Sequence, residues 1–367
     1  MYFQSLRDET GCATDRALTS RVILETTYPK APVSPLMQET LQLNTSNTLT
    51  ENQLVSQMVS SPLDLSFGHG SFGMQETCWA GILCCLLLAS FFVGSLYVWR
   101  STLPRDHPSV IRRRFTSVLI VSIISPLVVW AWTDWMKILS GVPLMALMGI
   151  RLEGVVPAGI LPLLLTMMLF LGPLAQLAVD SPKGILVEIR LRYLRSLALC
   201  VRDLKWLRNH VVAPVTEELV FRACMVPVIV PCTGPTAAIF ICPLFFGVAH
   251  FHHIREQLRS GCDSLGDILI IAVFQFAYTY VFGIYSAFIF IRTGHLLAPV
   301  LCHSFCNSMG FPDFCRALEH PQRPVILFCY QLGVLLFLMC LLPLTDPFFY
   351  GMTPICILFL HPRAVCS

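Results

Sequence analysis

Charged residues are scarce in this chain. They make up 13% of its 367 residues, whereas 55% are hydrophobic and the mean hydropathy is +0.68. This composition excludes an ordinary soluble domain, in which about a quarter of the residues are charged. The net charge of +3 and the lack of any long Lys/Arg block argue against a nucleic-acid partner. The lipid bilayer is therefore the expected surrounding, and the chain is expected to cross it several times.

Several signatures that would define a reaction or a destination are missing. The chain has no His-Glu-x-x-His zinc-protease motif and no Gly-x-Ser-x-Gly nucleophile motif. Met1 is not followed by a basic region and an apolar core, so no ordinary signal peptide is predicted. Cys302, His303 and Cys306 share one turn, but no second soft-ligand cluster completes a zinc set. We therefore expect no metal and no other cofactor.

Polar and apolar stretches divide the chain into three parts. Residues 1–75, rich in Ser, Thr, Gln, Asn and Pro, are predicted to be a disordered extension. Residues 76–350 form the predicted transmembrane domain, with the polar motifs in a core at 205–311, and residues 351–367 form a C-terminal tail.

Apolar segments recur along the middle part at the length that a membrane-spanning helix needs, about 20 residues. They are 78–99, 115–133, 154–179, 211–230, 234–251, 267–291, 295–311 and 325–343. Some are short or carry polar residues, as expected of helices that line a cavity. The pattern predicts an all-α polytopic bundle of about eight transmembrane helices.

Basic residues are distributed unevenly among the loops between these segments. Most fall in loops 100–114, 180–210, 252–266 and 312–324, whereas the intervening loops hold only Lys137, Arg151 and Arg292. The positive-inside rule places the basic loops in the cytosol and both termini in the lumen. Within the second basic loop, residues 183–206 suit either an anionic cytosolic leaflet or an ordinary solvated linker helix.

Ionisable residues interrupt the apolar segments in the second half of the chain, where they are costly and point to function. Glu218 and Arg222 are four residues apart, so they can form an ion pair on one helix face and support the site. Glu217 projects about 100° away from Glu218 and is left for chemistry. It lies nine residues after Arg208, about 13 Å along the helix from its cytosolic end.

Three further polar residues are predicted to reach the same cytosol-facing cavity. His250 lies near the cytosolic end of its helix, and His303 and Asn307 lie toward that end of another. The last two are four residues apart, so they present two hydrogen-bond donors that could hold an oxyanion. A carboxylate and an imidazole in a partly desolvated cavity can activate water, so hydrolysis is the expected reaction. The neighbouring His252 and His253 are expected to reach the membrane interface.

These motifs also carry a resemblance to a known family. Glu217-Glu218-x-x-x-Arg222, Phe246-x-x-x-His250 and His303-x-x-x-Asn307 resemble, in order, the motifs of the glutamate-type intramembrane proteases. That family includes the CAAX proteases and bacteriocin-processing enzymes. Similarity to its eukaryotic CAAX-processing members extends through residues 216–224, 245–253, 301–307, 103–108 and 343–347.

The resemblance implies an endoplasmic reticulum enzyme that removes the last three residues from prenylated Cys-a-a-X proteins such as Ras-like GTPases, without a metal. By motif position, Glu217 is the implied water-activating base and His250 its partner. His303 and Asn307 are the implied stabilisers of the transition state. The predicted topology agrees with this, because prenylated substrates arrive on the cytosolic leaflet, where the polar cavity is expected to open.

Two other functions fit the same polar residues. A membrane transporter or proton pathway also places Glu, Arg and His within the bilayer, although no inverted repeat is visible between the two halves. A non-catalytic protein could bind prenylated tails without cutting them, but such a protein would not need both the glutamate and the histidine. Taken singly, each residue also has a structural explanation, such as a buried ion pair or a helix–helix hydrogen bond.

Overall fold

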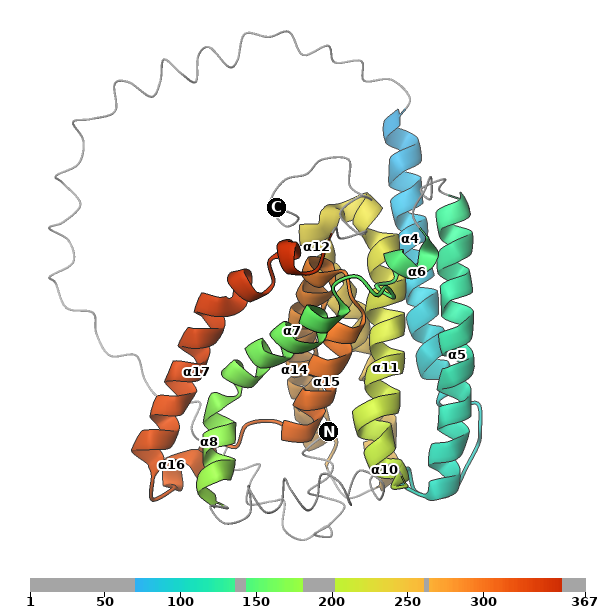
Figure 1. Cartoon of the computed structure of the whole chain (residues 1–367). Coiled ribbons are helices and arrows are strands. Elements are labelled where there is room, and N and C mark those ends of the chain that lie inside the picture. Colours follow the sequence, from blue (N-terminus) through green and yellow to red (C-terminus); the bar gives the residue numbers. More distant parts are fainter. Residues whose placement is uncertain (1–69, 136–142, 181–201, 261–263, 352–367) are drawn as a thin grey trace, which may run out of the picture. The chain divides into compact units, whose positions relative to one another are not determined.

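A computed structural model describes residues 70–135, 143–180, 202–260 and 264–351 of the chain (Figure 1). Most of the C-terminal tail, of the N-terminal extension and of the 183–206 segment lies outside these residues. Every regular element in the described residues is a helix, which confirms the all-α fold class. In chain order the elements are α4 (Gly70–Ser95), α5 (Pro108–Trp135), α6 (Leu144–Leu147), α7 (Val155–Leu169), α8 (Leu171–Asp180), α10 (Leu204–Leu207), η2 (Arg208–Val212), α11 (Ala213–Glu218), η3 (Leu219–Cys224), α12 (Met225–Ala249), α13 (His252–Ser260), α14 (Leu265–Thr293), α15 (Leu297–Met309), α16 (Phe314–Glu319), α17 (Arg323–Leu344) and η4 (Pro347–Phe349).

All eight predicted segments are helical, but the count of eight membrane spans is not confirmed. Within the described residues, five helices are long and apolar enough to cross a membrane, or six if α7 and α8, bent by 71°, form one span. Three differences separate the eight predicted segments from these five helices. Helix α15 has only 13 residues, α7 and α8 are long enough only if taken together, and the segments predicted at 211–230 and 234–251 are counted as one helical stretch, Leu204–Arg259.

That long stretch folds back on itself at Gly234. Its φ of 78° and ψ of 163° break the helix in a conformation that favours glycine, with Pro231 and Pro235 close by on either side. The rings of Phe221 and Phe246, on opposite sides of the break, have centroids 5.1 Å apart. The two arms therefore lie side by side, which brings the first and second motifs together although they are more than twenty residues apart.

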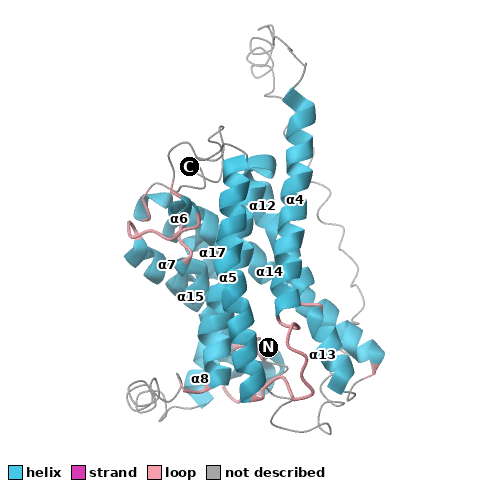
Figure 2. Cartoon of the chain, turned by 90° about the vertical axis from the view of Figure 1, so that its right-hand side faces the viewer, coloured by secondary structure: helices cyan, strands magenta, loops and turns pink. Residues whose placement is uncertain are grey.

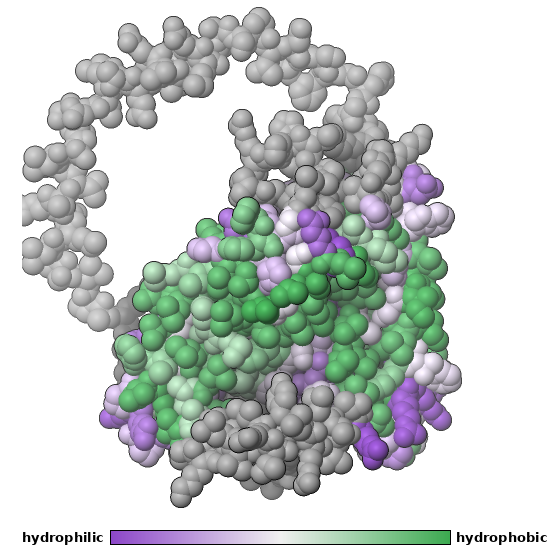
Figure 3. All heavy atoms as spheres, viewed as in Figure 1, coloured by the Kyte–Doolittle hydropathy of each residue, from purple (hydrophilic) through white to green (hydrophobic). Residues whose placement is uncertain are grey.

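Two hydrophobic clusters hold the bundle together. The larger joins α4, α5, η3, α12 and α14, and the smaller joins α7, α14, α15 and α17. In the view of Figure 2 the long helices α4 and α5 have roughly parallel axes. Large apolar side chains such as Leu87, Ile123 and Val273 are exposed on the outside, and Figure 3 shows hydrophobic residues covering the middle of the molecule with hydrophilic ones toward its ends. This surface fits a protein that spans the bilayer.

Candidate active site

The bundle brings the three motifs together from four helical elements. Glu217 and Glu218 end α11, and Arg222 lies in η3, a π-helical turn. His250 follows directly after the last residue of α12, while His303 lies on α15. π-Helical turns are rare and occur often at functional sites, because they change the direction of the side chains that follow them.

Glu218 is the centre of a buried polar network, and its side chain is 0% exposed. Its Oε2 accepts a hydrogen bond from Ser286 Oγ at 2.6 Å and lies 3.1 Å from Arg222 Nε, so the predicted ion pair is present. Its Oε1 lies 2.8 Å from His303 Nδ1. Because both oxygens are engaged, Glu218 holds its neighbours in place and has no free oxygen for a water.

Arg222 is held by aromatic faces as well as by Glu218. Its guanidinium carbon lies 4.3 Å from the centroid of the Phe246 ring and 6.0 Å from that of Phe282. Its two terminal nitrogens have no hydrogen-bond partner among the described residues. A guanidinium over ring faces is stabilised by the ring quadrupoles, so the helix arms of the hairpin pack around a charge that Glu218 neutralises.

Glu217 differs from its neighbour in being open to a cleft. Its side chain is 14% exposed, and its Oε2 lies 3.8 Å from Nε2 of His303. His303 therefore connects the two glutamates: one ring nitrogen hydrogen-bonds to Glu218 and the other faces Glu217. Since a carboxylate can only accept, the bond to Glu218 assigns a proton to Nδ1 of His303.

His250 lines the same cleft as Glu217. Its Nδ1 donates a hydrogen bond to the Phe246 carbonyl at 2.8 Å, because a carbonyl can only accept. In the neutral ring, Nε2 is then left as an acceptor that can bind a water proton. Glu217 and His250 make no direct contact that the structure records, so a water molecule would have to join them.

Asn307 lies on α15 with His303, and its side chain is already engaged in one hydrogen bond. Its Nδ2 donates a hydrogen bond to the Asn209 carbonyl at 2.9 Å, and on the same helix Ser304 Oγ donates to the His210 carbonyl at 2.7 Å. These bonds fasten α15 to η2. Asn307 is half-buried and is not among the residues that line the cleft described here. One of its two amide protons is left for another acceptor.

The cleft lies between α4, α5 and the two arms of the hairpin. Its cavity volume is about 90 Å³, enough for several water molecules. Helices α4 and α5 contribute an apolar wall, and the hairpin contributes Glu217 and His250. The residues of the apolar wall are Phe92, Val93, Leu96, Phe115 and Val118.

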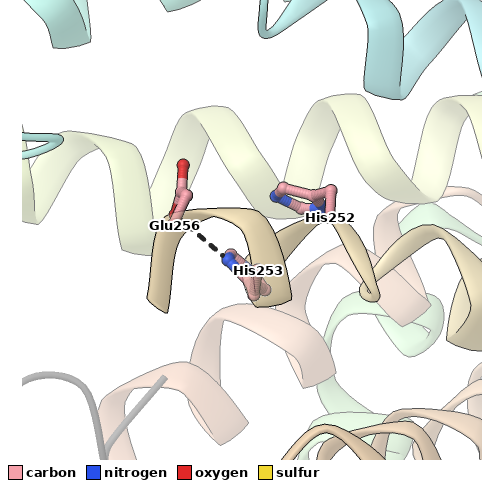
Figure 4. A group of neighbouring side chains, drawn as sticks. All are labelled: His252, His253 and Glu256. Carbon is pink, nitrogen blue, oxygen red and sulfur yellow. Dashed lines mark hydrogen bonds and ion pairs between the residues drawn. The ribbon is translucent and has the colours of Figure 1, made fainter. Parts of the chain in front are cut away.

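A second charged network, which no sequence pattern indicated, is centred on Glu256 of α13. Glu256 Oε1 lies 2.6 Å from Arg114 Nη2, and its Oε2 lies 3.3 Å from Arg105 Nη1 and 3.2 Å from His253 Nδ1. The expectation that His253 reaches the interface is wrong, since His253 is 6% exposed and turns toward Glu256 (Figure 4). His252, His253 and Glu256 offer three atoms that could hold a metal, but a cation would compete with two guanidinium groups for Glu256.

Comparison with known proteins agrees with this geometry. The family model for the type II CAAX prenyl endopeptidase Rce1-like proteins matches residues 203–309, which contain all three motifs. The chain is 60% identical to CAAX prenyl protease 2 of Homo sapiens over 290 residues, covering 79% of this chain and 88% of the human protein. Identity to CAAX prenyl protease 2 of Rattus norvegicus is 55% over 309 residues, 84% of this chain and 90% of the relative.

A more distant relative, CAAX prenyl protease 2 of Arabidopsis thaliana, is 33% identical over 292 residues, 74% of this chain and 91% of the relative. No solved structure matches the chain. The extent of these similarities, over most of each relative, confirms the resemblance seen in the motifs. The chain belongs to the Rce1-like family of type II CAAX prenyl endopeptidases.

Proposed function

We propose that this protein removes the C-terminal tripeptide from prenylated Cys-a-a-X proteins such as Ras-like GTPases, using a water molecule activated by Glu217. The observation that carries the proposal is the contrast between the two adjacent glutamates. Glu218 has both oxygens engaged by buried partners, whereas Glu217 faces the cleft beside His250 and close to His303. A general base must have an oxygen free for the water from which it takes a proton.

In the proposed reaction, a water molecule lies between Glu217 and Nε2 of His250. Glu217 takes a proton from it as the oxygen attacks the carbonyl carbon of the prenylated cysteine. Nε2 of His303, when protonated, and the second amide proton of Asn307 donate to the oxyanion that forms. The proton held by Glu217 then passes to the nitrogen of the leaving tripeptide, and the carbon–nitrogen bond breaks. Glu218 and Arg222 keep His303 oriented throughout.

The residues that line the cleft support separate places for the prenyl chain and the peptide of the substrate. The wall from α4 and α5 presents aromatic and aliphatic side chains, which suits a hydrocarbon chain attached to the cysteine. The hairpin presents carboxylate and imidazole groups, which suit the peptide bond. Burial of an isoprenoid contributes about 25 cal/mol for each Å² of apolar surface removed from water, so the prenyl group would supply much of the binding.

We place the enzyme in the endoplasmic reticulum membrane with the cleft toward the cytosol. The distribution of Lys and Arg among the loops supports this orientation. A tag at Met1 should then be protected from added protease in sealed vesicles, and a tag within residues 183–201 should be removed. The reverse pattern would place the cleft on the side that prenylated substrates do not reach.

The direct test uses purified protein and a farnesylated peptide that ends in Cys-a-a-X. Mass spectrometry should detect the released tripeptide and the peptide that now ends in farnesylcysteine. The matched control is Glu217→Gln, which keeps the size of the side chain and removes the base. Binding of the peptide without release of the tripeptide by the unaltered protein would contradict the proposal and favour a non-catalytic binder.

A further inference from the structure

Three arginines line the cleft that holds Glu217. Arg105 lies between α4 and α5, Arg114 belongs to α5, and Arg208 begins η2. Three separate parts of the chain thus bring guanidinium groups to one cleft, and we call these three residues the basic rim. Their side chains are only 16–20% exposed, so they are held in the wall and do not extend freely into solvent.

Carboxylates hold the three arginines in place. Glu256 lies 3.3 Å from Arg105 and 2.6 Å from Arg114, and Asp106 lies 2.6 Å from Arg208. Lys205 Nζ is a second cation on Asp106, at 3.3 Å. With Glu217, which lines the same cleft, the group contains four cations and three carboxylates, which leaves one positive charge beside the cleft.

The pKa of Arg105 reflects both its burial and the charges around it. Burial lowers that pKa most, and the nearby charges of Arg208 and Arg114 lower it further, while Glu256 and Asp106 act in the opposite direction. Like charges held close together in a partly desolvated wall repel one another, so an incoming anion would be attracted. Arginine is suited to a carboxylate in particular, because its fork of donors matches two oxygens.

We propose that the basic rim binds the free α-carboxylate at the C-terminus of the Cys-a-a-X substrate. This inference rests on the proposed function, in which Glu217 attacks the bond three residues from that end. Three extended residues reach about 10 Å, so a carboxylate held at the rim would position the scissile bond within the cleft. Binding of the chain end at the rim would then fix which peptide bond lies at Glu217. That bond is three residues from the end, so a tripeptide would be released. The phosphate of an anionic lipid has similar oxygens and could bind the same groups.

The experiment compares two farnesylated peptides that differ only at the C-terminus, one a free acid and the other an amide. The amide keeps the size and the aliphatic residues but removes the charge. In neutral detergent micelles we expect the acid to be cleaved with roughly 10- to 100-fold higher kcat/KM, the range of one charge-assisted hydrogen-bonded contact. Equal cleavage of acid and amide by the unaltered protein would overturn the proposal without any variant having to fold.

Variants of the rim arginines then test whether the basic rim causes the preference for the free acid over the amide. Arg114→Gln and Arg208→Gln should each lower kcat/KM for the acid and leave that for the amide nearly unchanged. The control is Arg113→Gln, because Arg113 is adjacent to Arg114 on α5 and exposed; it should keep the full preference for the acid. A variant that loses acid and amide cleavage equally would indicate a structural role and contradict the assignment.

To distinguish the substrate carboxylate from a lipid phosphate as the ligand of the rim, the comparison of acid and amide is repeated with phosphatidylserine added to the micelles. If the rim serves the substrate carboxylate, the preference for the acid is present without anionic lipid, and added lipid can only compete with it. A preference that is absent in neutral micelles would identify lipid phosphate as the ligand and overturn the proposal. Failure of the acid peptide to yield any tripeptide would instead count against the proposed function itself.

Discussion

Nδ1 of His303 lies 2.8 Å from Oε1 of Glu218, so the buried glutamate determines the orientation of a histidine whose other ring nitrogen lies 3.8 Å from Glu217. The other oxygen of Glu218 is held by Ser286 and Arg222. Helices α11, α14 and α15 and the turn η3 therefore meet at one carboxylate. A fully buried carboxylate with three hydrogen-bonding partners is stable only while all of them remain in place.

The first prediction concerns this network. Ser286→Ala should lower kcat with little change in KM, because His303 loses a fixed orientation while the cleft keeps its shape. It should also lower the stability of the protein by about 1–3 kcal/mol, the usual cost of removing a hydrogen bond to a charged group. Melting in detergent and single-turnover cleavage measure the two effects. Wild-type turnover together with a lowered melting point would limit Ser286 to a structural role.

The second prediction distinguishes the adjacent glutamates. Glu217→Gln should reduce cleavage by about 10²–10⁴-fold, the range expected when a general base is lost, and leave melting and peptide binding nearly unchanged. Glu218→Gln should lower the melting temperature as well as the rate, because it leaves the Arg222 charge buried without its partner. If Glu217→Gln kept near-normal cleavage, the roles of the two residues would have to be exchanged or abandoned.

The third prediction tests Asn307 against a neighbour with the same structural attachment. Asn307→Ala should lower turnover by about 10²–10³-fold if its second amide proton stabilises the oxyanion. Ser304→Ala removes the parallel hydrogen bond from α15 to η2 without removing that donor, so it should keep most of the activity. Equal losses in the two variants would mean that Asn307 acts through the attachment of α15 alone.

The fourth prediction concerns metals. The proposed chemistry uses carboxylate, imidazole and amide groups, so cleavage should survive extensive treatment with chelators in metal-free buffer. The Glu256 cluster should behave in the same way, since its carboxylate is paired with Arg105 and Arg114. Loss of activity on chelation, followed by recovery with one equivalent of zinc, would require a different mechanism.

The fifth prediction concerns His295, in the connection between α14 and α15. Its side chain is 1% exposed, and burial followed by the charge of Arg151 lowers its pKa to about 4. The unfolded chain, with a histidine pKa of about 6.5, binds a proton between these values while the folded protein does not, so stability falls as the pH is lowered. Between pH 7.5 and pH 5, the titration of His295 should lower the free energy of unfolding by about 2 kcal/mol.

Melting of the wild type and of His295→Gln at the two pH values checks this expectation. The variant should show a smaller difference between them, because glutamine does not titrate. The control is His107→Gln, since His107 is exposed, and it should keep the full dependence on pH. Identical pH dependence in His295→Gln and the wild type would contradict the assignment.

Much of the fold follows from local patterns. Apolar runs of the right length determine where α4, α5, α14 and α17 lie, because a segment in lipid must satisfy its backbone hydrogen bonds internally and does so as a helix. The number of membrane spans could not be read in the same way. Whether α15, with 13 residues, or the bent pair α7 and α8 crosses the bilayer depends on which neighbours cover it, and a local pattern does not contain that information.

The candidate site was likewise predictable from the sequence only in part. Spacing of four residues was enough to predict the Glu218–Arg222 pair, since both side chains lie on one helix face. The sequence by itself also determined which residue types could activate water. Only the tertiary structure decided that His303 bridges the two glutamates, that Ser286 of α14 donates a hydrogen bond to Glu218, and that Arg105, Arg114 and Arg208 line one cleft. These contacts join residues far apart in the chain, and they depend on the fold at Gly234 and on how the helices pack against one another.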